Sequence, residues 1–117
     1  CMHEVLFDGS FLDGSGIKTI DFAKAMIDSG FHPPTMYFPL VVEGALLFEP
    51  TETESKESLD ELIEVVIELA KMVRKKELSE YFDQSPMNAP RLRLDETHAA
   101  RNPILRWKSN PLLKAAE

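Results

Sequence analysis

The chain has 117 residues, with 13 Lys and Arg against 20 Asp and Glu, which gives a formal charge of −7 and a pI near 5.0. Its length suits one small domain with a modest core. An acidic surface argues against nucleic acid and membrane as partners, because both attract clustered Lys and Arg. A single Cys cannot form an internal disulfide, and no apolar run approaches the ~20 residues of a spanning helix, so a cytoplasmic protein is predicted.

The first seven residues, starting at Cys1, are rich in large apolar side chains and predict a strand. Because this strand begins without a polar lead-in, we expect the chain to be cut from a longer protein. Residues 8–16 contain three of the five glycines and predict a loop. Thr19 is predicted as the N-cap of a helix that runs to about Ser29, and Gly30 as the residue that ends it.

Two prolines stiffen the connector at residues 31–34, since each Pro disfavours helix in the residue before it. Strands are predicted at 35–38 and 45–48, on either side of a turn at 43–44. Pro39 ends the first of these strands or marks it as an edge. The short connection makes an antiparallel pair.

A long amphipathic helix is the clearest element, and its apolar side chains share one stripe: Leu59, Leu62, Ile63, Val66, Ala70 and Val73. Acids gather at its start and basic residues at its end, as the helix dipole favours: Lys71, Arg74, Lys75 and Lys76. Thr51, with Glu54 at capping-box spacing, and Ser55 are equally good N-caps. A short second helical piece is predicted over 78–82.

Four prolines from Pro86 to Pro111 prevent any long element in the last part of the chain. We therefore divide the chain into a domain at residues 1–82 and an extended arm and tail at 83–117. Residues 108–117 are predicted to be loosely held. Some arm residues are apolar enough to pack over the domain or over a partner: Leu92, Leu94, Ile104, Leu105 and Trp107.

The element order β-α-β-β-α, with one long covering helix, predicts an α+β fold. In it a small sheet carries helices on one face, and an extended C-terminal arm follows.

Physical chemistry alone assigns no reaction to these residues. The three histidines (His3, His32 and His98) lack metal-ligand spacing, and no nucleophile or phosphate-binding motif is present. The acids between residues 49 and 61 fit the start of a helix better than a cation site. A hairpin would bring some of the polar groups at the Pro-bounded strand ends together, and turn and cap roles explain them equally well: His32, Thr35, Glu49, Thr51 and Glu52.

Two contiguous segments, FHPPTMYFPL and EPTETESKESLDELI, closely resemble the C-terminal region of the glycine dehydrogenase (decarboxylating) family. This is the P-protein of the glycine cleavage system, here the second subunit of the two-chain prokaryotic type. Three more segments are similar to the same region: CMHEVLF, GIKTIDFAKAMIDSGFHPP and LRLDETHAARNPILRW. The resemblance runs from Cys1 to about Trp107.

The resemblance implies the small domain of an aminotransferase-like enzyme that uses pyridoxal phosphate (PLP) as an electron sink. The family decarboxylates glycine and passes the aminomethyl group to the lipoyl arm of the H-protein. The implied partners are a missing N-terminal large domain, the other P-protein subunit, lipoylated H-protein and glycine. The family's cofactor lysine belongs to the large domain, and Lys18, Lys24 and Lys56 lack its sequence context. The chain alone is therefore expected to be inactive and not to bind PLP.

In enzymes of this architecture the active site lies between the large and small domains. The resemblance therefore places two segments near that cleft by position alone, with these candidate residues: His32, Pro33, Thr35, Glu49, Thr51 and Glu52. His3 and Glu4 form a second, weaker set. No metal site and no catalytic residue are assigned.

One alternative is a stand-alone α+β module that binds a ligand or dimerises without catalysis. A genuine start codon at Met2 would favour it, whereas an upstream reading frame with the cofactor lysine would favour the enzyme domain. Apolar surface left uncovered by a missing large domain would also make the isolated chain self-associate.

Overall fold

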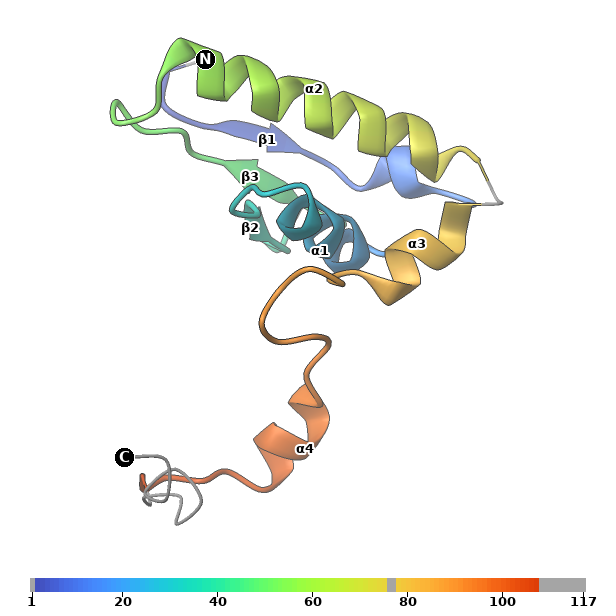
Figure 1. Cartoon of the computed structure of the whole chain (residues 1–117), viewed down its shortest axis with the longest axis vertical. Helices are drawn as coiled ribbons and strands as arrows, with labels where there is room; N and C mark the ends of the chain where they lie inside the picture. Colours follow the sequence, from blue (N-terminus) through green and yellow to red (C-terminus); the bar gives the residue numbers. More distant parts are fainter. Residues whose placement is uncertain (1, 76–77, 108–117) are drawn as a thin grey trace.

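The computed structural model describes residues 2–75 and 78–107, so Cys1, Lys76 and the predicted loose tail at 108–117 lie outside the described residues. The elements are, in order, β1 (Val5–Phe7), a 3-10 turn η1 (Ser10–Leu12), α1 (Thr19–Asp28), β2 (Thr35–Met36), β3 (Leu46–Phe48), α2 (Lys56–Val73), α3 (Ser79–Gln84) and α4 (Glu96–Arg101) (Figure 1). The prediction of an α+β fold is confirmed. Among the described residues, no helix combines the length and apolar character needed to cross a membrane.

The sheet has the order β1-β3-β2, and both outer strands run antiparallel to β3. Val5 pairs with Phe48, and Thr35 pairs with Leu47. The predicted antiparallel pairing of the second and third strands is thus confirmed. All three strands are shorter than predicted, and β3, at the centre, contributes the buried residues Leu46 and Leu47.

Strand β2 ends at Met36, two residues before its predicted end, because Tyr37 takes a left-handed backbone conformation with φ 57°. This conformation is rare for a bulky residue. The Tyr37 amide still donates to the carbonyl of Ala45 at 2.8 Å. Its hydroxyl accepts from the amide of Ile20 at 3.2 Å, which ties the hairpin to the first turn of α1.

The predicted N-cap of α1, Thr19, is wrong by one residue: Lys18 is the N-cap. The Lys18 amide donates to Asp21 Oδ2 at 2.9 Å. The Thr19 hydroxyl donates instead to the carbonyl of Gly44, at 3.0 Å. A tertiary contact with the hairpin therefore takes the side chain that the local pattern assigns to a cap. Gly30, with φ 87°, follows the end of α1 as predicted.

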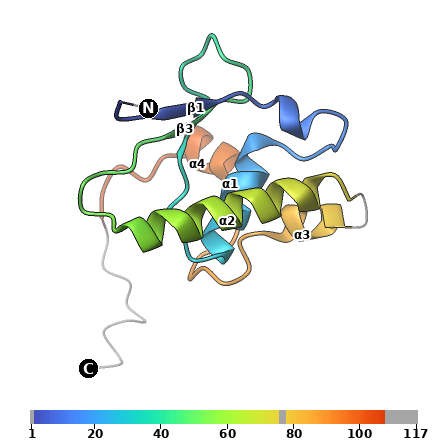
Figure 2. The same cartoon turned by 90° about the horizontal axis from the view of Figure 1, so that it is seen from above.

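The core lies between the sheet and three helices, and α1, α2 and α3 lie together on one side of β1 and β3 (Figure 2). Phe22 and Met26 of α1 meet Leu46 of β3, Leu69 of α2 and Phe82 of α3 in one buried cluster. The rings of Phe22 and Phe82 stack with centroids 6.4 Å apart. Each aromatic side chain buries enough apolar area to contribute about 2 kcal/mol, so this contact holds α3 on the domain.

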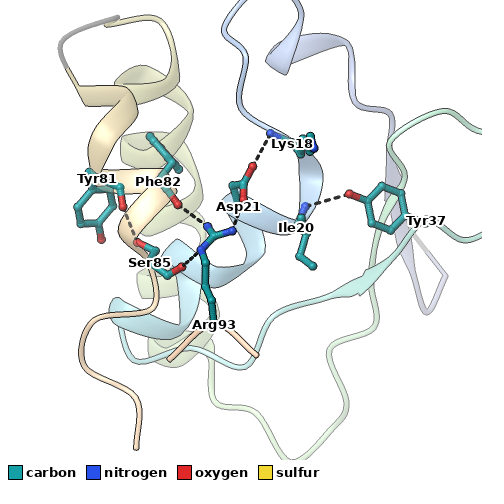
Figure 3. A network of polar contacts seen from close by, with 8 residues as sticks. All are labelled: Lys18, Ile20, Asp21, Tyr37, Tyr81, Phe82, Ser85 and Arg93. Atoms are coloured by element: carbon teal, nitrogen blue, oxygen red, sulfur yellow. Dashed lines mark hydrogen bonds and ion pairs between the residues drawn. The ribbon is translucent and has the colours of Figure 1, made fainter. Parts of the chain in front are cut away.

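Arg93 fastens the chain after α3 to the body of the domain (Figure 3). Its Nη1 lies 2.8 Å from Asp21 Oδ1, its Nε donates to the carbonyl of Ser85 at 2.9 Å, and its Nη2 donates to that of Phe82 at 2.7 Å. Three directions of one guanidinium are thus satisfied at once. We call this arrangement the Arg93 clamp.

A second attachment lies at the other end of α1. Asp28 accepts hydrogen bonds from the amides of Met87 and Asn88, both at 2.7 Å from Oδ1. Partial burial alone would raise the pKa of Asp28, but hydrogen bonds from the two amides and from the Ser85 side chain together outweigh it and hold that pKa below its ordinary value of 3.8. Residues 85–93 therefore follow α1 from its last turn to its first.

The arm beyond Arg93 contains a short helix that the sequence analysis did not predict. Helix α4 has six residues and begins where Asp95 Oδ1 accepts from the amide of His98 at 2.8 Å. The arm's large apolar residues do not pack over the domain, and their packing over a partner stays a prediction: Leu92, Leu94, Ile104, Leu105 and Trp107 are exposed. The division at residue 82 stays a prediction, although α3 continues past it to Gln84.

Replacing Arg93 by Ala should lower the free energy of unfolding of the chain by about 2 kcal/mol. The Asp21 side chain is 9% exposed and would lose its charged partner. Urea unfolding measures the change. Arg91→Ala removes the same charge from an exposed arginine nearby and should have almost no effect. Equal effects of the two substitutions would contradict the clamp.

Asp28→Asn should destabilise the chain most near neutral pH. Because the folded pKa is lowered, the stabilisation is complete above 3.8 and is lost as the pH falls through the lower folded value. The difference in unfolding free energy between wild type and variant should therefore shrink in acid. Asp13→Asn, at an exposed carboxylate, controls for the loss of one charge. A difference that grows in acid would be inconsistent with this sign.

Candidate functional site

A pocket of ≈250 Å³ forms where the connector before β2 meets the chain after β3. Antiparallel pairing of Thr35 with Leu47 places residues that precede β2 beside residues that follow β3. The pocket is lined by residues 31–34, by residues 48–51, by Glu54 just before α2, and by Ser58, Leu59 and Leu62 of α2. We call it the connector pocket.

The connector pocket has an apolar floor and a polar rim. Phe31, Phe48 and Leu62 pack against the hydrophobic core and form the floor. His32, Glu49 and Thr51 are exposed on the rim. Such a combination suits a small ligand, because the floor excludes water while a few polar groups fix orientation.

The start of α2 forms one wall of the connector pocket, and Ser55 is its N-cap, which decides between the two predicted caps. Ser55 Oγ accepts from the amide of Ser58 at 3.1 Å, and the Ser58 hydroxyl donates to Glu54 Oε2 at 3.1 Å. Thr51 belongs to the preceding turn, where its carbonyl accepts from the Glu54 amide at 3.1 Å. These local bonds fix the wall to the helix end.

The structure brings four of the six main candidates into the connector pocket: His32, Pro33, Glu49 and Thr51. Thr35 and Glu52 are exposed and do not line it. A role in a ligand site stays a prediction for all six candidates.

His3 and Glu4 are exposed, with Nε2 and Oε2 3.6 Å apart. Pairing of Val5 with Phe48 carries them past the end of β3 that leads into Glu49, but they do not line the pocket. Within residues 2–75 and 78–107, no group of three or more His, Cys, Asp or Glu is arranged to hold a metal ion.

The lining of the connector pocket does not fit PLP by itself. The described lining has two carboxylates, Glu49 and Glu54, and neither Lys nor Arg, so its charge opposes the phosphate group of PLP. A covalent site for PLP also needs a lysine in the pocket. The rim favours a cationic group, such as an ammonium, over an anionic one.

Sequence reasoning missed a larger groove of ≈820 Å³ between the loop at 8–19 and the hairpin at 37–44. Lys18 and Tyr37 line it, together with three acids: Asp8, Asp13 and Glu43. A hydroxyl and an amide from Ser10 both donate to Asp8 Oδ1 and hold the pKa of Asp8 below its usual value. The glycines in both segments predict turns. They do not predict that the two turns touch each other at Gly9 and Gly44.

A model of the family described as "Glycine dehydrogenase, C-terminal domain" matches residues 1–91. A probable glycine dehydrogenase (decarboxylating) subunit 2 of Caulobacter vibrioides is 61% identical over 108 residues, which are 92% of this chain and 20% of the relative. Proteins of the same description are 52% identical in Caldanaerobacter subterraneus subsp. tengcongensis and 50% identical in Halalkalibacterium halodurans, where the match covers 92% of this chain and 22% of each relative. The chain spans about a fifth of the length of the curated relatives it matches.

Ser55→Ala should destabilise the chain by about 1 kcal/mol, because the amide of Ser58 would lose its acceptor. Urea unfolding measures this change. Ser55→Asp keeps an acceptor at the N-cap and should retain most of the stability. Helix α2 would not depend on this cap if the Ala variant unfolded at the same urea concentration as wild type.

Proposed function

The chain belongs to the family of glycine dehydrogenase C-terminal domains, and on this premise we propose that it is the small domain of an enzyme that decarboxylates glycine. The complete enzyme passes the aminomethyl group to the lipoyl arm of the H-protein and uses PLP as its cofactor. The chain itself does not supply the cofactor lysine. Its part is to form one wall of the cleft in which the reaction occurs.

The observation that carries this proposal is the position of the connector pocket relative to the start of the chain. In a C-terminal domain, the rest of the protein precedes β1, and the pairing of Val5 with Phe48 brings that end beside the pocket. His32, Glu49 and Thr51 are exposed there. A preceding domain joined at this edge would cover their rim and close the pocket.

The chemistry of the rim indicates what it contacts in the closed cleft. Glu49 and Glu54 favour an ammonium group and repel a carboxylate or phosphate. The Thr51 hydroxyl and the His32 imidazole can each donate or accept a hydrogen bond. We assign the rim to the amino end of glycine or to the aminomethyl group that is passed on. The phosphate of PLP and the glycine carboxylate belong on the opposite wall.

The proposed partners follow from this placement. The preceding large domain meets the pocket edge, and the lipoyl arm of the H-protein reaches the cleft through the opening between the two. The other P-protein subunit completes the enzyme, which we place in the cytoplasm, in keeping with the single Cys. In isolation the chain self-associates through its exposed apolar side chains.

Two pairs of matched substitutions test the role of the rim. The test protein is the Caulobacter vibrioides relative with its matching segment replaced by residues 1–107 of this chain, called here the grafted protein. Thr51→Val and Glu49→Gln each remove one polar group from the pocket. Thr35→Val and Glu52→Gln make the same changes outside it.

Glycine–bicarbonate exchange with PLP, H-protein and the other subunit should fall about tenfold or more in the two pocket variants, because each loses a contact made during the reaction. The outer variants should stay within about twofold of the grafted protein. All four should retain the absorbance of bound PLP. Full exchange in both pocket variants would remove the connector pocket from the active site and favour an assembly module.

A further inference from the structure

The part of the arm from Leu92 to Trp107 leaves the body of the domain and presents apolar side chains to water. From here on, the arm means this part alone. Leu92 and Leu94 are 62% and 65% exposed, and Trp107 is 87% exposed. Figure 1 shows α4 well below the sheet and the other helices, and Figure 2 shows it behind them along the same axis. Apolar side chains gathered in so short a segment mark a contact surface.

The start of the arm is held, so the direction in which it leaves the domain is set by the domain itself. The Arg93 clamp joins it to Asp21, and Asp28 holds the amides of Met87 and Asn88. A fixed start loses less conformational entropy when the rest of the segment binds. The arm is therefore prepared for binding while its apolar side chains stay free.

The comparisons place the arm inside the proteins that continue beyond this domain. The family model ends at residue 91, but the matches to the relatives cover 92% of the chain and so extend into the arm. Those relatives hold about four fifths of their length outside the match. The arm thus occurs in proteins that have a large body of chain available to cover it.

The charge of the arm also differs from that of the body. The whole chain carries −7, yet the arm has Arg93, Arg101 and Arg106 against Asp95 and Glu96. Arg93 turns inward to the clamp, and the other two arginines are exposed. Residues 93–97 lie against Ile20 and Lys24 of α1, and beyond them the exposed apolar and cationic groups of the arm are available to another surface.

We propose that the arm docks on the preceding part of the same protein, at the side of the domain opposite to the chain entry. The entry at β1 and the arm would then hold the domain at two separated points. A preceding part of roughly 400 residues would be about 55 Å across. The longest extent of this chain is 49 Å, so such a body joined at the connector pocket is large enough to reach the arm.

This docking rests on the proposed function only in taking the chain as the C-terminal part of a longer protein. It adds a consequence for the cleft. A domain attached at one point could rotate about its entry strand, whereas attachment at two points fixes the distance between the connector pocket and the opposite wall.

Hydrogen exchange read by mass spectrometry tests the proposal, with the grafted protein and the isolated 117-residue chain compared at matched low concentration. Amides of residues 92–107 should exchange at least about tenfold more slowly in the grafted protein, because docking protects them. The double variant Leu105→Ser/Trp107→Ser should lose that protection. Both side chains are exposed, so the same double variant should leave the exchange of α1 and α2 unchanged in the isolated chain.

The matched control is Leu40→Ser/Val41→Ser, at two equally exposed apolar residues of the hairpin, which should leave the arm protected. Equal arm exchange in the grafted protein and the isolated chain would overturn the proposal. Arm protection that rises with concentration in the grafted protein would overturn it in favour of a second copy. Protection that appears only when the other subunit is added would overturn it in favour of that subunit.

The readout is independent of glycine–bicarbonate exchange. If the arm is protected in the grafted protein and the pocket variants are fully active, the docking proposal is supported and the proposed function is contradicted. If the arm is unprotected and the pocket variants are inactive, the docking proposal is contradicted and the proposed function is supported.

Discussion

The structure depends on one buried carboxylate, that of Asp21. Its Oδ2 accepts from the amide of Lys18 and so fixes the first turn of α1, while its Oδ1 pairs with Arg93 at 2.8 Å. Through Arg93 the same carboxylate fixes the carbonyls of Phe82 and Ser85 at the end of α3. The start of α1, the end of α3 and the first residues of the arm thus depend on the Asp21 side chain, which is 9% exposed. Loss of Arg93 would leave the buried Asp21 carboxylate without its charged partner, and it would release the carbonyls of Phe82 and Ser85 at the same time.

The candidate site depends on a different constraint, the register of the small sheet. Pairing of β2 and β1 with β3 places three chain segments at one edge: the proline-rich connector, the turn before α2, and the start of the chain. The prolines and the Ser55 cap hold the first two segments. Polar groups therefore stand on a stiff frame and face the place where a preceding domain would join. This arrangement suits a domain that positions ligands for chemistry supplied by another part of the protein.

Local patterns were sufficient to predict the elements that local forces decide. The stripe from Leu59 to Val73 predicted α2, and Gly30 predicted the end of α1, because helix periodicity and left-handed glycine are properties of neighbouring residues. The pairing of β2 with β3 followed from a short connection. The same hairpin argument anticipated that some polar groups at the strand ends would lie together, without saying which, and His32, Glu49 and Thr51 line one pocket.

The features that sequence reasoning missed are decided by contacts between distant residues. Thr19 lost its predicted cap role to a bond with Gly44, 25 residues away. Tyr37 adopts a left-handed conformation, and its hydroxyl accepts a hydrogen bond from Ile20 of α1. The Arg93 clamp joins three elements, and the groove at Gly9 and Gly44 joins two turns, so no local pattern specifies either.

Photo-crosslinking tests most directly whether the connector pocket faces the reaction cleft. A benzoylphenylalanine replaces His32 in the grafted protein, and crosslinked peptides are identified by mass spectrometry after PLP has been fixed to its lysine by borohydride reduction. The proposed placement predicts crosslinks to the preceding part of the protein, at or near the peptide that carries PLP, and few from a probe at Thr35. Crosslinks confined to this domain, or equal from both positions, would contradict it.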